Sequence, residues 1–277
     1  MTMGTEAPLD EVTVTQRLLA VAPSRGERRA LVEGHAGLSC SYADLAATVQ
    51  TAAAGLAWRG LQPRDVVGVY VPDAACYVLA VHAIRAAGGV PTPLAASLTV
   101  PEMAGQLADC GARMLLTAPP LAAAALAAAD RSWVRQVISF GEAPDTTLFS
   151  GLLGMGSLRP ATGRPHDPAL LPYTRQPDGV LGPEPLSHYD LSGLLRRLEA
   201  EGGIGEKDVV LAAPPAGDGR SYTALVDHAL LRGATVVSAP AEELAAAADL
   251  HQGTAIIVAG SVAVGAHERL RVFAVAS

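Results

Sequence analysis

The histidines and cysteines are the residues whose types most directly suggest catalysis or metal binding. The chain has seven histidines and three cysteines. The cysteines form no Cys-x-x-Cys pair, and their odd number cannot complete a disulfide set. The histidines lack metal-ligand spacing, and no Gly-x-Ser-x-Gly motif supplies a serine nucleophile. We therefore expect no metal, and we interpret the cysteines as small buried hydrophobic side chains and the histidines other than His188 as structural groups.

The composition indicates a globular protein. Half of the 277 residues are hydrophobic and 17% are charged, so enough apolar surface is available to offset chain entropy. The net charge of −7 gives no reason to expect nucleic acid as a partner. The most apolar stretch, 74–96, contains His82 and Arg85, and residues 1–11 do not resemble a secretory signal. We expect no membrane contact and a cytoplasmic location.

Strand and helix patterns alternate along the chain. Ser41 with Asp44 and Thr99 with Glu102 are candidate capping boxes, each opening a helix. The Gly- and Pro-rich region 141–168 is expected to be an irregular connector. The expected strands are 66–71, 113–117, 134–140, 209–213, 234–238, 254–259 and 271–275, and the expected helices include 73–88, 189–201, 222–232 and 241–250. Repeated strand–helix–strand units predict mostly parallel sheets covered by helices.

Several stretches, in this order and spacing, resemble the N-terminal part of the adenylate-forming acyl-CoA synthetases, including 4-coumarate-CoA ligase-like enzymes. The stretches are 41–45 (SYADL), 60–67 (GLQPRDVV), 85–90 (RAAGGV), 99–102 (TVPE), 111–113 (GAR), 208–211 (DVVL) and 232–237 (RGATVV). Residues 171–173 (LPY) and 186–188 (LSH) match the two ends of the family's phosphate-binding signature without a gap. The resemblance spans nearly all of this chain and roughly half of a typical family member.

The resemblance implies two related α/β subdomains, similar to the first part of the family's large domain. We expect the first subdomain at 1–165, with about 40 N-terminal residues able to pack on the second, and the second at 166–277. The family's later segments, which carry its ribose-binding aspartate and catalytic lysine, do not occur in this sequence, and we expect a truncated member.

The phosphate-binding signature departs from the family pattern between its two ends. The family lysine falls on Gly182, and Pro177, Pro183 and Pro185 remove backbone donors. Asp178 and Glu184 add negative charge where phosphates would bind. The family's Leu-Pro-x-Phe-His motif falls on 214–218, where the aromatic residue and the histidine are missing. The departures predict that the chain forms no acyl adenylate and needs no ATP or other cofactor.

The resemblance also places the remaining polar residues around one cleft. His188 and Asp218 are the candidate catalytic residues, each as a general base. The candidate substrate-binding residues are Tyr173, Thr174, Arg175, Asp178, Arg220 and Tyr222. Arg175 or Arg220 would hold an anion. The alternative is that these side chains form a relaxed loop surface, and it is the stronger interpretation for His188.

Two hypotheses for function remain open. The first is an ATP-independent, repurposed acyl-CoA synthetase-like protein that acts on an acyl or aromatic intermediate of biosynthesis. The second is a non-catalytic partner or scaffold that binds a biosynthetic enzyme or a carrier protein. Whether the chain is an enzyme is therefore left open. Because the missing segments would cover sheet edges and apolar faces, we expect a homo-oligomer or a complex with a partner.

Overall fold

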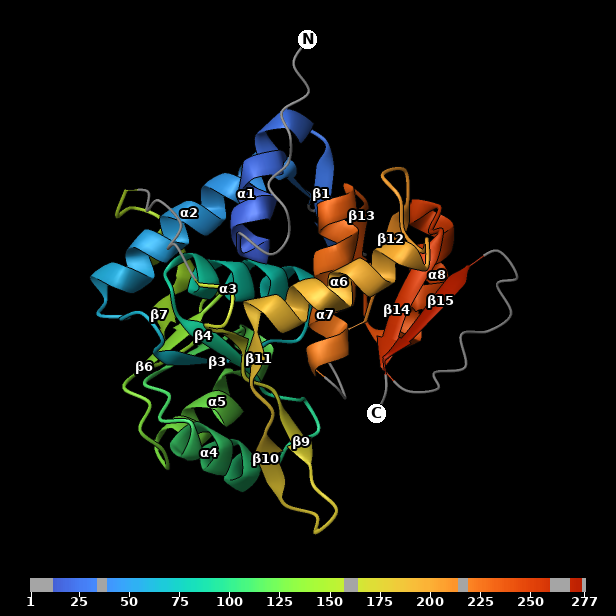
Figure 1. Ribbon diagram of the computed structural model, residues 1–277. Coiled ribbons are helices and arrows are strands. Elements are labelled where there is room, and N and C mark those ends of the chain that lie inside the picture. The colour runs from blue at the N-terminus through green and yellow to red at the C-terminus, as the bar shows by residue number, and fades with distance from the viewer. Residues whose placement is uncertain (1–11, 34–38, 157–163, 214–218, 260–269, 276–277) are drawn as a thin grey trace.

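The protein contains two main β-sheets with helices packed between and around them (Figure 1). The computed structural model describes residues 12–33, 39–156, 164–213, 219–259 and 270–275. Within these described residues, one sheet has five strands and the other has six. Nearly all neighbouring strands of these two sheets are parallel, which confirms the predicted α/β fold class.

The five-stranded sheet is wholly parallel. Its strands, in spatial order, are β4 (Val90–Pro93), β3 (Val66–Tyr70), β5 (Met114–Thr117), β6 (Gln136–Ser139) and β7 (Thr147–Leu148). The helices α4 (Val100–Asp109) and α5 (Ala122–Ala129) cover one face, and α2 (Tyr42–Trp58) and α3 (Ala74–Ala86) lie on the other side (Figure 1). Burial on both faces explains why β3 and β5 read as continuous apolar runs.

The six-stranded sheet combines strands from both ends of the sequence. Its strands, in spatial order, are β15 (Arg271–Val275), β14 (Ala255–Ala259), β12 (Val209–Ala212), β13 (Thr235–Ser238), β1 (Arg29–Glu33) and β2 (Ser39–Ser41). Among the described strands of this sheet, only β1 and β2 pair in antiparallel orientation. The helices α7 (Gly219–Arg232) and α8 (Leu244–His251) pack against its strands. The first 41 residues thus supply two strands of this second sheet.

Helix α3 contacts strands of both sheets. Its side chains Tyr77 and Ile84 belong to one hydrophobic cluster that also contains Val69 of β3 and Val236 of β13. The alanine-rich sequence of α3 permits this because small side chains let a helix approach two sheets closely. The two sheets therefore share one apolar core.

The predicted helix caps are confirmed. Ser41 with Asp44 opens α2, and Thr99 with Glu102 opens α4, each as a reciprocal capping box. Asp73 caps α3, its carboxylate accepting a hydrogen bond from the Cys76 backbone N–H at 2.7 Å. These helices begin where expected because a cap is a local signal.

Two helices begin three residues away from their expected starts. Helix α7 begins at Gly219, three residues before the expected start, and residues 241–250 divide into a 3₁₀ turn (Ala241–Glu243) and α8. The region 141–168 is also more ordered than expected, since it contains β7 and a 3₁₀ helix (Phe149–Leu152). Leu152 is fully buried, and the Phe149 ring stacks on Phe140. The many glycines and prolines of this region are typical of an irregular connector, so its buried apolar residues were not predicted.

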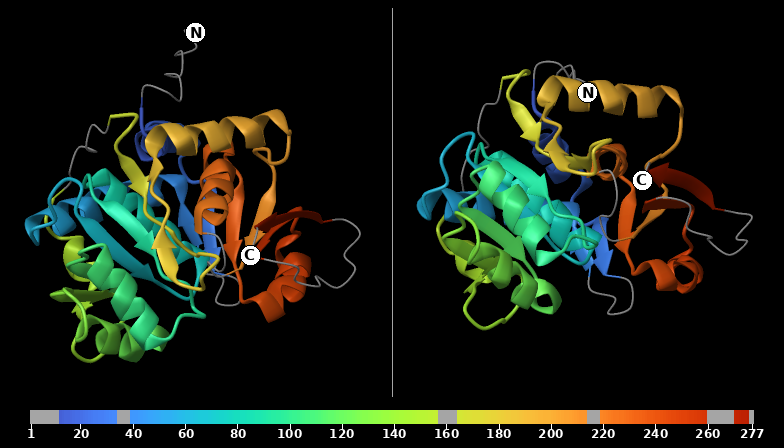
Figure 2. Two further views of the ribbon diagram at one scale, coloured as in Figure 1. Left: turned by 60° about the horizontal axis from the view of Figure 1, so that its bottom comes forward. Right: turned by 90° about the horizontal axis from the view of Figure 1, so that it is seen from below.

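Two further helices complete the side of the six-stranded sheet that α7 covers. Helix α1 (Val14–Arg25) contacts α7, and α6 (His188–Ala200) packs on α7 as the outermost helix there (Figure 2). Within the described part of the chain, no helix combines the length and the apolar character needed to span a membrane. The remaining short elements are a 3₁₀ turn at Pro119–Leu121 and the strands β8 (Pro168–Leu170), β9 (Tyr173–Arg175), β10 (Leu181–Pro183) and β11 (Leu186–Ser187).

Candidate functional site

The sequence between the two ends of the phosphate-binding signature folds into a β-hairpin. Strand β9 pairs antiparallel with β10, and Thr174 lies opposite Gly182 in the register. The turn contains Asp178 and Gly179, and Gly179 has a φ of +83°, which glycine adopts at no steric cost. The Asp178 Oδ1 accepts a hydrogen bond from the Val180 N–H at 2.9 Å, which closes the turn. Asp178 therefore shapes the hairpin.

Two side chains of β9 fasten the hairpin to α4. The Arg175 guanidinium pairs with Glu102 Oε1 at 2.9 Å and donates to the Gly179 carbonyl at 2.8 Å. The Tyr173 hydroxyl donates to the Asp109 carboxylate, and burial, reinforced by this carboxylate, raises the pKa of Tyr173. A backbone hydrogen bond from Thr99, together with Arg175, lowers the pKa of Glu102 to about 2. The cation predicted to hold a phosphate is therefore already paired.

The third polar residue of β9 is also engaged. The Thr174 hydroxyl donates to Glu184 Oε1 at 2.8 Å. The backbone N–H of Glu184 donates to the Pro172 carbonyl at 2.9 Å, so this glutamate is held next to the hairpin. Of the predicted substrate-binding residues, the structure thus brings Tyr173, Thr174, Arg175 and Asp178 together, each with a partner from the hairpin, its flanking residues or α4.

His188 is the first residue of α6, directly after the cap residue Ser187. Its side chain is buried, and burial, with the positive charge of Arg85, lowers its pKa to about 4. The imidazole is therefore neutral at pH 7. Its Nδ1 atom has no hydrogen-bond partner among the described residues. The charged groups that act on it are Arg85, Asp167 and Asp227, whereas the hairpin side chains pair elsewhere.

Tyr222 does not lie at the surface of a cleft, contrary to the placement expected from the resemblance. Its side chain is fully buried, and its hydroxyl donates to the Ala213 carbonyl at 2.7 Å. Its ring packs edge-to-face on Tyr77, with the ring centroids 5.4 Å apart. Tyr222 belongs to the buried part of α7, which begins three residues before the expected start. Its role in substrate binding stays a prediction.

The other two predicted residues lie near the start of α7. Arg220 is half-buried on the first turn, and its charge helps Ser187 to lower the pKa of Asp190 on α6. Asp218 belongs to the segment 214–218, which lies outside the described residues. The structure therefore does not test the predicted role of Asp218 as a general base.

A buried polar network was missed by the sequence analysis. The Thr15 hydroxyl lies 2.9 Å from His82 Nδ1, and His82 Nε2 lies 3.2 Å from Asp227 Oδ1. Arg85 pairs with the other oxygen of Asp227 at 2.9 Å. The order hydroxyl–imidazole–carboxylate resembles a hydrolytic triad. However, Thr15 is 1% exposed and, unlike the residues of the polar pocket described below, does not line that pocket, so we interpret the network as structural.

In the described part of the chain, these groups are accompanied by no candidate metal site and no activated thiol. Among the described residues, no cluster of three His, Cys, Asp or Glu side chains could hold a metal ion. The three cysteines are unbridged and half-buried. Burial raises the pKa of Cys40 and of Cys110 to about 11, so both thiols stay protonated at neutral pH.

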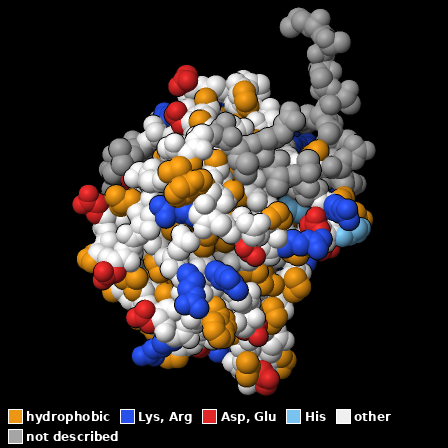
Figure 3. Space-filling view, turned by 90° about the vertical axis from the view of Figure 1, so that its left-hand side faces the viewer, with side chains coloured by type: hydrophobic (Ala, Val, Ile, Leu, Met, Phe, Trp, Pro, Cys, Tyr) orange, Lys and Arg blue, Asp and Glu red, His pale blue; other side chains and the backbone are white. Residues whose placement is uncertain are grey.

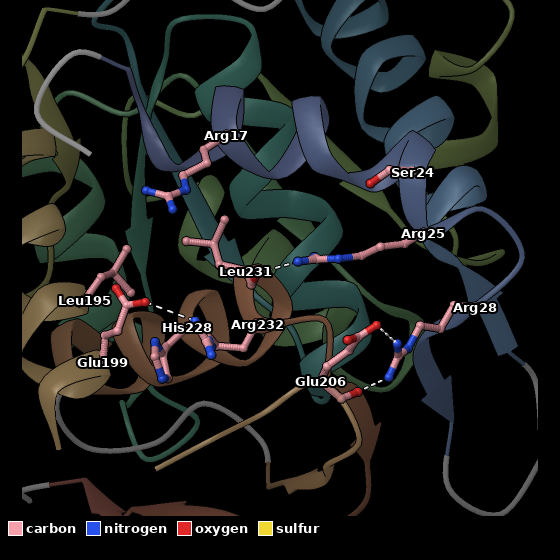
Figure 4. Close-up of a pocket in the computed structure, with 10 residues that line it drawn as sticks. All are labelled: Arg17, Ser24, Arg25, Arg28, Leu195, Glu199, Glu206, His228, Leu231 and Arg232. Atoms are coloured by element: carbon pink, nitrogen blue, oxygen red, sulfur yellow. Dashed lines mark hydrogen bonds and ion pairs between the residues drawn. The ribbon is translucent and has the colours of Figure 1, made fainter. Parts of the chain in front are cut away.

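A polar pocket of about 440 Å³ lies between α1, α6 and α7 (Figure 4). It contains none of the predicted site residues. Its charged lining comes from Arg17 and Arg25 of α1, Arg28 just beyond α1, Glu199 of α6, Glu206, and Arg232 of α7. These lining residues are too far apart in the sequence to form a motif, so the sequence could not predict this pocket.

Comparison with protein families gives a match over most of the chain. The model of the AMP-binding enzyme family covers residues 19–264. A feruloyl-CoA synthase from Amycolatopsis sp is 28% identical over 203 residues, which is 73% of this chain and 39% of that protein. The 4-coumarate–CoA ligase 5 of Oryza sativa subsp. japonica is 30% identical over 198 residues, 69% of this chain and 36% of that protein. The chain thus spans well under half the length of these curated relatives.

Solved structures agree on the fold. The apo structure of Mycobacterium smegmatis MbtA superposes with a TM-score of 0.81 at 24% identity, over 90% of this chain and 48% of that one. A long-chain-fatty-acid-CoA ligase from Archaeoglobus fulgidus gives a TM-score of 0.79 at 21% identity, over 90% and 52% of the two chains. The family match over residues 19–264 shows that this chain belongs to the AMP-binding enzyme family.

Proposed function

We propose that this acyl-CoA ligase-like chain binds an acyl or aromatic acid without activating it through ATP. The relatives named for feruloyl-CoA and 4-coumarate-CoA support an aromatic acid as the ligand class. The observation that carries the proposal is the hairpin β9–β10, whose polar side chains are paired with one another, with the residues beside it and with α4.

The electrostatics of the hairpin oppose phosphate binding. Phosphates bind best where backbone N–H groups converge or where local positive charge exceeds negative charge. Here Arg175 is neutralised by Glu102, and Glu184 lies beside Thr174. The position of the family lysine is Gly182, on β10. The exposed Arg175–Glu102 pair could open, but the single arginine is outnumbered by the carboxylates of Glu102, Asp178 and Glu184, which repel phosphates.

Pyrophosphate release tests the proposal. The full chain would be incubated with MgATP and either 4-coumarate or ferulate, and binding of each acid would be followed by calorimetry. We expect saturable binding of an aromatic acid and no acid-dependent release of pyrophosphate. Acid-dependent pyrophosphate release would refute the proposal, because it reports adenylate formation directly. Absence of acid binding would refute the ligand class.

A surface patch supports a second candidate, a non-catalytic partner of a biosynthetic enzyme or a carrier protein. A pocket of about 220 Å³ at the start of β3, β5 and β6 is lined by Arg59, Arg113 and Arg135. None of these guanidinium groups forms an ion pair with a residue that the structure describes. Trp58 and Trp133, adjacent to this lining in the sequence, are 69% and 60% exposed.

Figure 3 shows the side of the molecule where α2 ends, and basic side chains gather there beside hydrophobic ones. Tryptophan and arginine are enriched at protein interfaces. A surface of this kind suits an acidic partner, or an acidic face of a second copy of this chain, whose net charge is −7. Sedimentation equilibrium with and without the Trp58→Ser/Trp133→Ser double variant tests self-association. A dimer that the double variant dissociates would support this candidate, whereas a wild-type monomer would exclude the homo-oligomer.

A further inference from the structure

We propose that the pocket between α1, α6 and α7 binds the phosphate group of a small organic phosphomonoester (Figure 4). This pocket is separate from the hairpin β9–β10 and shares none of its residues. The proposal is therefore independent of the proposed function. It assigns a ligand to a pocket that the adenylation chemistry of the family does not require.

The lining of this pocket has an excess of positive charge. Four arginines and two glutamates line the pocket, so positive charges exceed negative ones by two. The chain as a whole carries a net charge of −7. A concentration of cations in an acidic protein attracts anions to that place, and the concave shape strengthens the local field. The two glutamates, Glu199 and Glu206, moderate this field and do not cancel it.

Part of the basic lining is held in place by hydrogen bonds within the protein. The Arg25 guanidinium donates to the carbonyls of Leu230, at 2.6 Å, and Leu231, at the C-terminal end of α7. Arg28 is paired with both the carboxylate and the backbone carbonyl of Glu206. These contacts fix the two cations before any ligand arrives, and a pre-organised site loses less entropy on binding.

Other charged side chains of the lining can rearrange when a ligand binds. Arg232 pairs with Glu199 at 3.0 Å, and both side chains are about half-exposed. Such a pair contributes little stability, so a phosphate dianion can draw Arg232 away from Glu199. Arg17 extends from α1 toward the same pocket (Figure 4). Arginine binds phosphate oxygens with two parallel N–H groups, and two arginines from different helices can contact different oxygens of one tetrahedral group.

The lining also contains a buried histidine nitrogen that has no hydrogen-bond partner among the described residues. His228 lines the pocket and is 4% exposed, and its Nε2 atom has no hydrogen-bond partner among the described residues. A buried polar atom without a partner is costly, and native structures contain few of them. Burial, and then Arg232, lowers the pKa of His228, so the imidazole is neutral and can donate one hydrogen bond. A phosphate oxygen would satisfy this donor.

The size and lining of the pocket indicate an organic phosphate. A volume of about 440 Å³ exceeds the needs of inorganic phosphate and lies within the range typical of small-molecule sites. Leu195 and Leu231 add apolar surface to the lining. A planar carboxylate would occupy one arginine fork, whereas a phosphate can engage Arg17, Arg232 and His228 together. We therefore expect a phosphomonoester with a compact apolar or aromatic group.

Isothermal titration with phenyl phosphate tests the proposal, with inorganic phosphate and benzoate as the two comparison ligands. We expect one saturable site for phenyl phosphate, with weaker binding of both comparison ligands. Arg17→Gln should weaken binding about tenfold, which is the effect of losing one charge-assisted hydrogen bond. Glu199→Gln should instead tighten binding, because it removes a negative charge and releases Arg232.

The opposite signs of these two effects separate a binding site from a structural role. Arg131→Gln, at an exposed residue just beyond α5, makes the same charge change as Arg17→Gln outside the pocket and should leave the affinity unchanged. The absence of saturable phenyl phosphate binding would overturn the proposal. Equal weakening by Arg17→Gln and Arg131→Gln would also overturn it, by showing a general charge effect. If inorganic phosphate bound as tightly as phenyl phosphate, the organic part of the ligand would be refuted.

Discussion

Arg85 of α3 and Asp227 of α7 form an ion pair of 2.9 Å in which both side chains are almost completely buried. Burial alone would raise the pKa of Asp227, but Arg85 and His82 together lower it, so the carboxylate is ionised. Arg85 also donates from Nε to the Ala169 carbonyl at 2.8 Å. The pair thus joins α3, which lies between the sheets, to α7 and to β8.

Removal of one partner should be strongly destabilising. Asp227→Asn would leave the Arg85 cation buried without its counter-ion, and we expect a loss of roughly 3–5 kcal/mol in the free energy of unfolding. Glu199→Gln is a matched control, because it removes an exposed pair with Arg232 and should change stability by less than about 1 kcal/mol. Urea denaturation of both variants measures the difference. Similar losses in the two variants would show that burial of the Arg85 pair carries no special weight.

His188 should make stability depend on pH below neutrality. Its pKa falls from an ordinary 6.5 to about 4 on folding, so the unfolded chain binds a proton at a higher pH than the folded chain. The stability contributed by the neutral imidazole is therefore complete above pH 6.5 and is lost as the pH falls toward 4. Between pH 7 and pH 5 the loss should be about 2 kcal/mol.

Substitution isolates this effect from other titrating groups. In His188→Gln the fall in stability between pH 7 and pH 5 should be about 2 kcal/mol smaller than in the wild-type chain, as measured by urea denaturation at each pH. His228, whose pKa is also lowered, is present in both proteins and cancels in the comparison. An unchanged pH slope would mean that the folded protein accommodates the imidazolium without cost.

Two helical glycines should respond oppositely to the same substitution. A Cβ atom at Gly55 in α2 would lie 2.4 Å from the Leu152 carbonyl oxygen, and this backbone cannot move away easily. We expect Gly55→Ala to cost roughly 3 kcal/mol or more, despite the better helix propensity of alanine. A Cβ atom at Gly105 in α4 meets nothing within 4 Å, so Gly105→Ala should stabilise by about 0.5–1 kcal/mol. Thermal unfolding distinguishes the two; destabilisation of both would contradict the packing argument.

Local patterns in the sequence predicted most helices and strands. Pairings between residues far apart in the sequence could not be predicted from such patterns. Ser41 with Asp44 caps α2 because both partners lie within one turn, which a sequence reader can see. The pairing of Leu31 with Val236 joins β1 to β13 across most of the chain, and only the packed structure reveals it. The same holds for Arg25, which lies in α1 and caps the distant end of α7.

The sequence predicted that polar residues of 173–178 belong to one candidate site. It predicted neither the hairpin nor the partners of their side chains. Asp178-Gly179 is a strong two-residue turn signal between the short runs 173–175 and 181–183, and it could have predicted the hairpin. The partners Glu102 and Asp109 lie on a helix about 70 residues earlier, so no local pattern could show that Arg175 and Tyr173 are paired. The burial of Tyr222 likewise depends on its packing against Tyr77 of α3, which lies far away in the sequence.

Restoring the family lysine alone should not restore adenylation. A Cβ atom at Gly182 would meet only the flexible Gln176 side chain, at 3.0 Å, so Gly182→Lys should fold with little loss of stability. The new cation would lie opposite Thr174 and near Glu184, while Pro177, Pro183 and Pro185 still lack N–H donors. We expect no acid-dependent pyrophosphate release with MgATP and 4-coumarate, and an unchanged melting temperature within a few degrees. Pyrophosphate release by this single variant would show that the hairpin retains a competent phosphate site and lacks only one charge.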